Sequence, residues 1–215
     1  MKQISPSVLD VKHEEFLDYI NTLVDWGVKR IHYDVMDGFF VPNKGIPENL
    51  ILETISKAKK HEIEFHLMVK DVFQYYNIYS KHKGLLIFHY EAMNKQTLEE
   101  LINKAKQDNV KLGLAINPNT NEKEIINYLK DLSLILVMSV NPGLGGQSFI
   151  EDSYNKISNL RKYIDENNLK TIIEVDGGVK QHNIKKCFEA GVGVAVVGSY
   201  LVNNFSKKTV EELLD

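Results

Sequence analysis

The segment Ile31-His32-Tyr33-Asp34-Val35-Met36-Asp37-Gly38 has the pattern of a short strand that runs into a turn. Residues 29–34 include β-branched and aromatic side chains, and Asp37-Gly38 is a turn dipeptide. Side chains alternate along a strand, so His32 and Asp34 share one face. At the carboxyl end of a strand, an imidazole and a carboxylate can bind one divalent cation together. A buried histidine bonded to its neighbouring carboxylate would give the same pattern, so the other strand ends decide between the two interpretations.

Strand-like and helix-like segments alternate along the whole chain. Strands are predicted at residues 3–8, 29–34, 62–68, 85–89, 111–116, 134–139, 171–176 and 193–197, and helices at 13–26, 48–61, 72–81, 95–108, 122–130, 150–167, 182–190 and 207–214. The strands are short, apolar and flanked by turn residues, which is typical of a parallel sheet buried on both faces. Eight strand–helix pairs predict a (β/α)8 barrel that forms a single domain over residues 1–215. A doubly wound sheet is the alternative, but no GxGxxG motif follows the first strand.

Composition narrows the classes of function. The 215 residues carry a net charge of −3 and no basic stripe with interleaved aromatics, so we expect no nucleic-acid partner. No apolar run reaches membrane-spanning length, and residues 1–6 do not resemble a signal peptide. The single cysteine, Cys187, cannot form an internal disulfide, which fits a reducing compartment. We therefore expect a cytoplasmic protein.

In a (β/α)8 barrel the active site lies at the carboxyl ends of the strands. Polar or small residues occupy nearly all of these ends here, and a barrel built only for stability would not need them. They are Ser7, His32, Asp34, His66, His89, Glu91, Asn117, Asn141, Asp176, Gly198 and Ser199.

Two imidazoles and two carboxylates, His32, Asp34, His66 and Asp176, come from three of these strands. Mixed nitrogen and oxygen ligands suit Zn, Fe, Mn or Co better than Mg or Ca. Carboxylates on separate strands could flank a substrate, so that one removes a proton and the other delivers it to the opposite face. The metal would act as a Lewis acid and stabilise the enediolate. His66 alone, on an apolar strand, would be interpreted as a core histidine.

Glycines and methionines also gather at the strand ends. Gly177-Gly178 and Gly198-Ser199 follow the last two strands, where barrels commonly bind phosphate. Residues 141–146 are glycine-rich enough for a mobile cover or a phosphate contact, although glycines also serve tight turns. Met36, Met68 and Met138 form either gap-filling core or an apolar collar that excludes water.

These residues resemble those of a known family, the ribulose-phosphate 3-epimerases, over essentially the whole chain. The motifs that carry the resemblance are Ile4-Ser5-Pro6-Ser7, His32-Tyr33-Asp34-Val35-Met36-Asp37-Gly38, Phe40-Val41-Pro42-Asn43, His66-Leu67-Met68-Val69, Phe88-His89-Tyr90-Glu91, Val137-Met138-Ser139-Val140, Pro142-Gly143-Leu144-Gly145-Gly146-Gln147, Val175-Asp176-Gly177-Gly178 and Val197-Gly198-Ser199. So many motifs in one order are far more specific than any single motif.

The resemblance implies a barrel of the ribulose-phosphate-binding type. It would interconvert D-ribulose 5-phosphate and D-xylulose 5-phosphate in the pentose phosphate pathway. Asp34 and Asp176 would be both metal ligands and acid/base groups, and His32 and His66 would complete the site of one divalent ion. The substrate contacts that carry over are Ser7, His66, Gly143, Leu144, Gly145, Gly146, Asp176, Gly177, Gly178, Gly198 and Ser199. The resemblance also implies a homo-oligomer, either a dimer or a hexamer.

Two departures from the family pattern lie together after the second strand. Phe39 replaces the histidine that usually follows Asp-Gly, and Lys44-Gly45-Ile46 replaces a Thr-Phe-Gly-like segment. Both departures change the sequence of this loop, and neither changes one of the four candidate metal ligands. Asp37 is interpreted as a structural residue that orients this loop, and His89 and Glu91 as supporting residues. Two alternatives stay open: a 3-epimerase of a hexulose phosphate such as allulose 6-phosphate, and a sugar-phosphate-binding barrel without catalysis.

Overall fold

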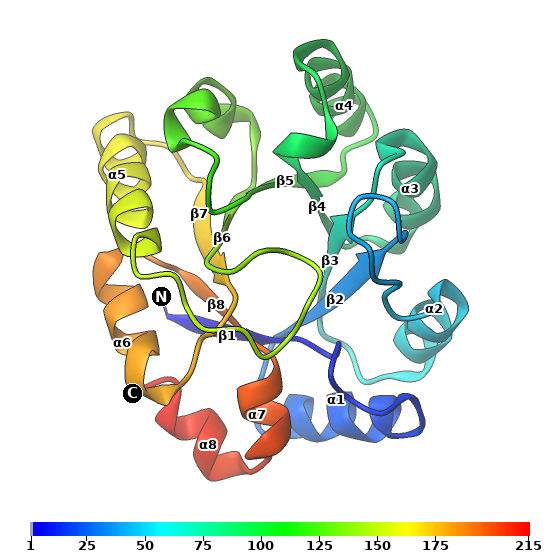
Figure 1. Ribbon diagram of the computed structural model, residues 1–215. Coiled ribbons are helices and arrows are strands. Elements are labelled where there is room, and N and C mark those ends of the chain that lie inside the picture. The colour runs from blue at the N-terminus through cyan, green and yellow to red at the C-terminus, as the bar shows by residue number, and fades with distance from the viewer. Residues whose placement is uncertain (1) are drawn as a thin grey trace.

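The computed structural model describes residues 2–215 and contains one sheet of eight parallel strands in the order β1-β8-β7-β6-β5-β4-β3-β2. The strands are β1 (Gln3–Pro6), β2 (Arg30–Met36), β3 (Glu62–Met68), β4 (Leu85–His89), β5 (Lys111–Ile116), β6 (Leu134–Met138), β7 (Ile172–Asp176) and β8 (Val194–Val197). The sheet curls until its two edges meet, where Ser7 pairs with His32 in a parallel bridge. The Val8 N–H also donates to the carbonyl of His32 at 3.3 Å. The predicted (β/α)8 barrel is therefore confirmed (Figure 1).

Helices surround the barrel in an outer ring (Figure 1). They are α1 (Phe16–Asp25), α2 (Glu48–Lys57), α3 (Val72–Tyr79), α4 (Lys95–Gln107), α5 (Ser153–Glu166), α6 (Gln181–Ala190), α7 (Ser199–Asn203) and α8 (Lys207–Glu212). In α4, Leu98, Leu101, Ile102 and Ala105 are buried at the spacing of one helical face. Among residues 2–215, no helix has the length and apolar character needed to cross a membrane.

One predicted α-helix, residues 122–130, is instead a pair of 3-10 helices, η4 (Glu122–Glu124) and η5 (Ile126–Asp131). A capping box closes η4 after one turn, because the Asn121 side chain accepts from the backbone while the Glu124 carboxylate accepts the Asn121 N–H. Ile125, with φ −112°, then separates the two turns. Local capping therefore prevails over the periodic pattern that predicted an α-helix.

Other boundaries also differ from prediction. The helix α2 ends at Lys57, because Ala58 is extended and the Lys59 N–H donates to the Asn21 side chain. The short helix α7 was not predicted, since five residues leave no readable helical period. The strand β2 runs two residues past its predicted end, to Met36, and this extension brings Met36 to the mouth of the barrel.

The interior of the barrel has an apolar half and a polar half. Side chains on and just after β4, β5 and β6 form the apolar half, which consists of Leu85, Ile87, Ala115, Leu134, Leu136, Met138 and Val140. The polar half contains six fully buried side chains: Ser5, His32, Glu64, His66, His89 and Glu174. Burying such groups is costly unless they bond to one another, so their concentration marks the functional side of the barrel.

Candidate active site

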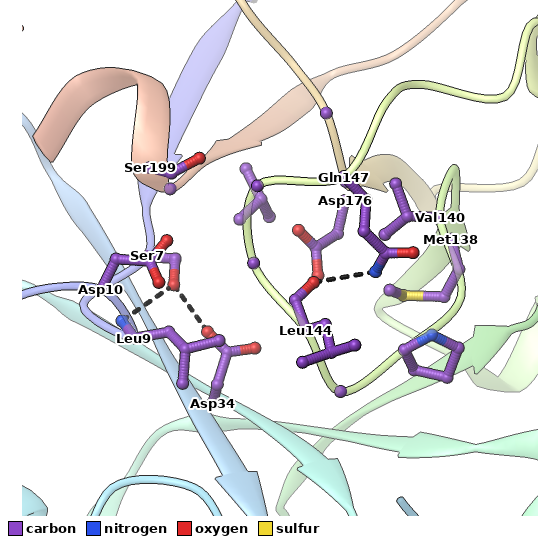
Figure 2. A pocket seen from close by; sticks show the side chains of 18 of the residues that line it. Ser7, Leu9, Asp10, Asp34, Met138, Val140, Leu144, Gln147, Asp176 and Ser199 are labelled. Atoms are coloured by element: carbon purple, nitrogen blue, oxygen red, sulfur yellow. Dashed lines mark hydrogen bonds between the residues drawn. The ribbon is translucent and has the colours of Figure 1, made fainter. Parts of the chain in front are cut away.

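A pocket opens at the carboxyl ends of the strands (Figure 2). Asp34 at the end of β2 and Asp176 at the end of β7 reach into it from separate walls. Met36, Met68 and Met138 line it as buried side chains, as the collar interpretation expects. All predicted substrate contacts line this pocket except His66, which lies fully buried within the barrel interior.

His32, Asp34, His66 and Asp176 form one compact cluster, in which one ligand atom from each lies within 4.8 Å of all the others. The Nδ1 atom of His66 lies 3.2 Å from Asp34 Oδ1 and 3.5 Å from Asp176 Oδ2. The Nε2 atom of His32 lies 3.2 Å from His66 Nδ1, 3.5 Å from Asp34 Oδ1 and 3.9 Å from Asp176 Oδ2. The structure thus brings together the four residues predicted to bind a metal.

The spacing of these atoms fits a divalent cation. Ligand atoms that each lie about 2.0–2.2 Å from one ion lie roughly 3–3.5 Å from one another. The five separations that involve a histidine, 3.2 to 3.9 Å, are close to that range. Two imidazole nitrogens and two carboxylate oxygens also match the ligand preference of Zn, Fe, Mn or Co.

The electrostatics of the cluster favour charged groups despite its burial. Burial alone would raise the pKa of Asp34, but the neighbouring His32 and His66 hold it well below the ordinary value. Burial would lower the pKa of both histidines, but Asp34, Glu174 and Glu64 raise the pKa of His32. Asp176 and Asp34 likewise raise the pKa of His66. Protons therefore compete with a cation for these two histidines.

The end of the pocket where the sequence predicts phosphate binding is built from residues after β7 and β8. The backbone N–H groups of Gly177, Gly178, Gly198 and Ser199 donate to no backbone carbonyl of residues 2–215. Gly177 and Gly178 have φ angles of +118° and +65°, and a Cβ at Gly178 would lie 2.5 Å from the backbone nitrogen of Phe149. Only glycine fits this turn, and its free N–H groups can bind an anion.

The loop between β6 and α5 crosses the opening of the barrel as the yellow-green segment of Figure 1. The Gln147 side chain closes this loop by donating to the carbonyl of Asn141 at 2.7 Å. It also donates to the carbonyl of Leu144 at 2.9 Å, as Figure 2 shows. The Asn43 side chain donates to the carbonyl of Gly143 at 2.8 Å and joins the loop after β2 to it. The glycine-rich segment therefore covers the pocket and also lines it.

Two charged residues of the pocket were missed by sequence reasoning. The Asp10 carboxylate lies against Gly145, where an added Cβ would be 2.6 Å from Oδ2. Figure 2 draws Asp10 beside Ser7 at this end of the pocket. Burial and the charge of Asp34 raise the pKa of Asp10. Lys180 is the only cationic side chain among the described residues that line the pocket. Neither residue ends a predicted strand, so the strand-end rule could not select them.

The two departures from the family pattern lie in the loop after β2, between β2 and α2. The Asp37 carboxylate accepts the N–H groups of Phe39 and Phe40 at 2.8 Å and of Lys70 at 2.7 Å, as expected for a residue that orients this loop. Phe39 points outward and is 82% exposed. Gly45 packs on the strand itself, where an added Cβ would lie 2.9 Å from Met36 N. This loop supports the site from outside the pocket.

A closed parallel barrel with histidines and carboxylates clustered at its carboxyl mouth defines a (β/α)8-barrel enzyme. A model of the ribulose-phosphate 3 epimerase family matches residues 3–202. The chain therefore belongs to the ribulose-phosphate 3-epimerase family, whose named members are isomerases acting on carbohydrates.

Relatives named ribulose-phosphate 3-epimerase match nearly the whole chain. The Buchnera aphidicola protein is 39% identical, with 97% of this chain and 91% of the relative covered. The Bacillus subtilis protein is 35% identical with coverages of 99% and 98%, and the Escherichia coli protein is 34% identical with coverages of 99% and 96%.

Solved structures show the same architecture at low identity. A 3-hexulose-6-phosphate synthase from Salmonella typhimurium aligns with a TM-score of 0.71 at 16% identity and covers 99% of this chain and 98% of its own. A mutant tryptophan synthase α-subunit from Pyrococcus furiosus aligns with a TM-score of 0.75 at 15% identity, with coverages of 99% and 97%. These two likenesses concern the fold alone.

Proposed function

We propose that the chain interconverts D-ribulose 5-phosphate and D-xylulose 5-phosphate, with one divalent cation bound by His32, Asp34, His66 and Asp176. The observation that carries the proposal is the placement of Asp34 and Asp176. They reach one pocket from β2 and β7, which are not neighbours in the sheet. Inversion at a carbon requires one group to remove a proton and another to return it on the opposite face. Two carboxylates on separate walls meet that requirement.

The cation supplies Lewis-acid polarisation of the substrate oxygens, which lowers the cost of the negative charge that develops when the C3 proton leaves. The two aspartates move the protons. Each turns one oxygen, Oδ1 of Asp34 and Oδ2 of Asp176, toward the histidines. The opposite oxygens, Oδ2 of Asp34 and Oδ1 of Asp176, are then the atoms that carry the transferred proton.

The hydroxyl of Ser7 prepares Asp34 for this role, because it donates to Asp34 Oδ2 at 2.6 Å. The Ser7 oxygen itself accepts the N–H of Leu9 at 3.1 Å, so its direction is fixed. This donor stabilises the ionised carboxylate that must accept a proton. The methionine collar excludes water around the reacting carbons, and the glycine N–H groups bind the phosphate at the other end.

Deuterium exchange tests the proposal. D-Ribulose 5-phosphate would be incubated with the protein in heavy water and followed by NMR, with and without a chelator. We expect metal-dependent deuterium incorporation at C3 together with the appearance of D-xylulose 5-phosphate. Absence of exchange with Zn, Fe, Mn or Co supplied would contradict this substrate.

The same experiment separates the alternatives. Faster exchange into D-allulose 6-phosphate than into the pentulose phosphate would identify a hexulose-phosphate epimerase. Binding of both sugar phosphates without exchange into either would indicate a non-catalytic binding barrel. Deuterium enters the pentulose phosphate in the first case, the hexulose phosphate in the second and neither sugar in the third. One set of spectra therefore distinguishes the three outcomes.

A further inference from the structure

Each histidine of the cluster has a second ring nitrogen that faces away from it. For His32 this is Nδ1, which lies 2.6 Å from Glu64 Oε1. Glu64 is fully buried, and it also accepts from the Ser5 hydroxyl at 2.6 Å and from Arg30 at 3.3 Å. An ionised carboxylate only accepts, so Nδ1 of His32 must carry the proton. When a cation displaces any proton on Nε2, the lone pair of this nitrogen faces the cluster.

The second ring nitrogen of His66 has a different partner. Its Nε2 atom lies 2.8 Å from Nε2 of His89, and Nδ1 of His89 lies 3.3 Å from Glu91 Oε2. Glu91 is held in turn by the backbone N–H of Asn117 at 2.7 Å and by the hydroxyl of Thr120. Two ring nitrogens in contact share one proton. If His66 turns the lone pair of Nδ1 to a cation, its Nε2 donates to His89, and His89 donates to Glu91.

The register of the strands explains why the two histidines use different nitrogens. His32 lies opposite Glu64 and Asp34 lies opposite His66 in the β2–β3 pairing, so His32 starts one pleat deeper than His66. His32 lies deeper in the barrel, so it reaches the cluster with Nε2, the ring nitrogen farther from its backbone. His66 lies closer to the mouth, so it reaches the cluster with Nδ1, the nitrogen nearer to its backbone.

We propose that Glu64 and the His89–Glu91 pair are positioning residues that hold His32 and His66 in opposite tautomers. They thereby prepare Nε2 of His32 and Nδ1 of His66 for a divalent cation. The inference rests on the metal site of the proposed function. None of the three residues lines the pocket, so they act through the ligand histidines rather than on the substrate. Hydrogen-bond partners of this kind commonly contribute about 10–100-fold in metal affinity.

The chain offers a matched control in Glu174. It is as fully buried as Glu64 and belongs to the same polar half of the barrel. Its carboxylate has no hydrogen-bond partner among the described residues, and Oε1 lies 3.6 Å from Nδ1 of His32. Burial and the neighbouring charge of Glu64 raise the pKa of Glu174, whereas His32 holds the pKa of Glu64 below its ordinary value. A Glu174→Gln change therefore replaces a carboxyl of the same buried layer and leaves the 2.6 Å contact between Glu64 and His32 in place.

The experiment measures Zn²⁺ affinity by competition with a chelator, and the d–d absorption of the Co²⁺-loaded protein. We expect Glu64→Gln and His89→Phe each to weaken affinity about 10–100-fold and to change the Co²⁺ spectrum. Glu174→Gln should stay within about threefold of wild type, and His89→Gln, whose amide can still accept from His66, should recover most of the loss. Equal losses in Glu64→Gln and Glu174→Gln would overturn the proposal, because burial alone would then explain them.

Nitrogen-15 NMR of the histidine rings in the Zn²⁺-loaded wild-type protein gives an answer that does not depend on variants that fold poorly. We expect a proton on Nδ1 of His32 and on Nε2 of His66. The same tautomer in both rings would overturn the proposal. If the wild-type protein binds no divalent ion, the proposed metal site fails. Wild-type binding that is unchanged in folded Glu64→Gln and His89→Phe contradicts only the positioning role.

Discussion

Asp34 and Asp176 meet at a single ring nitrogen, since Nδ1 of His66 lies 3.2 Å from an oxygen of the first and 3.5 Å from an oxygen of the second. The strands that carry them, β2 and β7, lie apart in the sheet. In the proposed mechanism, the two carboxylates therefore share one cation position and approach the substrate from different walls. The proton-transfer roles of the two residues can therefore be tested by matched substitutions.

Replacing either aspartate by asparagine should stop epimerisation, but the remaining aspartate should still exchange a proton on its own face of the substrate. An amide cannot accept the proton, so we expect turnover to fall by about 10²–10⁴ in Asp34→Asn and in Asp176→Asn. Each variant retains one base, so each should exchange deuterium into only one of the two epimers, and the two variants should prefer opposite epimers. NMR of each pure epimer in heavy water would measure this.

Metal content and circular dichroism of both variants serve as controls, because each aspartate is also a proposed ligand. Near-normal turnover in either variant would exclude the two-base scheme. Exchange into the same epimer by both metal-loaded variants would show that the two carboxylates do not face opposite sides of the substrate.

Metal removal should abolish activity, and metal uptake should release protons. Burial would lower the pKa of His32 and His66, but the adjacent carboxylates raise it, so protons compete with a cation for these nitrogens. A cation must displace them, and its apparent affinity should fall as the pH decreases. Calorimetry in two buffers of different ionisation enthalpy should find at least about one proton released per ion near pH 7.

Zn, Fe, Mn or Co should restore activity to the chelated enzyme. Full activity with confirmed absence of metal would contradict the cation's role. An affinity that is constant between about pH 6 and 8 would contradict the proton competition, because a histidine with a raised pKa binds its proton more strongly as the pH falls through this range.

The barrel was predictable because its strands are short apolar runs whose spacing repeats, and periodicity is a signal that each segment carries by itself. The four clustered ligands were predictable for the same reason, since the fold rule sends strand-end side chains to one mouth. Glu64 and Glu174 could also have been predicted from the sequence. Each lies two residues before a ligand on the same inward face, and period-two alternation predicts a polar layer there.

Asp10 and Gln147 could not be found in this way. Their roles depend on how the loops after β1 and β6 fold over the mouth, and loop conformation leaves no periodic trace in sequence. The pair of 3-10 turns at residues 122–131 failed prediction for a related reason. Capping by Asn121 and Glu124 decided the local conformation, while the apolar spacing of Ile125 and Leu129 suggested an ordinary helix.

The charges of Asp10 and Lys180 should act in opposite directions on substrate binding. Asp10 lies at the end of the pocket where we propose that the glycine N–H groups donate to phosphate, so its charge would oppose a dianion. We expect Asp10→Asn to lower KM for the sugar phosphate by about 2–10-fold and Lys180→Met to raise it by a similar factor, with small changes in kcat. Steady-state kinetics at low and high salt would measure both effects. A higher KM in Asp10→Asn would show instead that the carboxylate binds a substrate hydroxyl.

Gly45 should be required by the site although it does not line the pocket. An added Cβ would lie 2.9 Å from Met36 N and 3.0 Å from Asp34 O, so Gly45→Ala must push the loop away from the strand that carries Asp34. We expect a loss of about 1–3 kcal/mol in stability, with weaker metal binding and lower turnover.

Gly27 provides the comparison, because its φ is +91° and a Cβ there would meet nothing within 4 Å. Gly27→Ala should cost about 1–2 kcal/mol through backbone strain alone and leave metal affinity and turnover unchanged. Denaturant unfolding and chelator competition on both variants separate the two effects. If Gly45→Ala loses stability but keeps wild-type metal affinity, the loop after β2 does not determine where Asp34 lies. The family departures at Phe39 and Lys44 would then matter only for the outer surface.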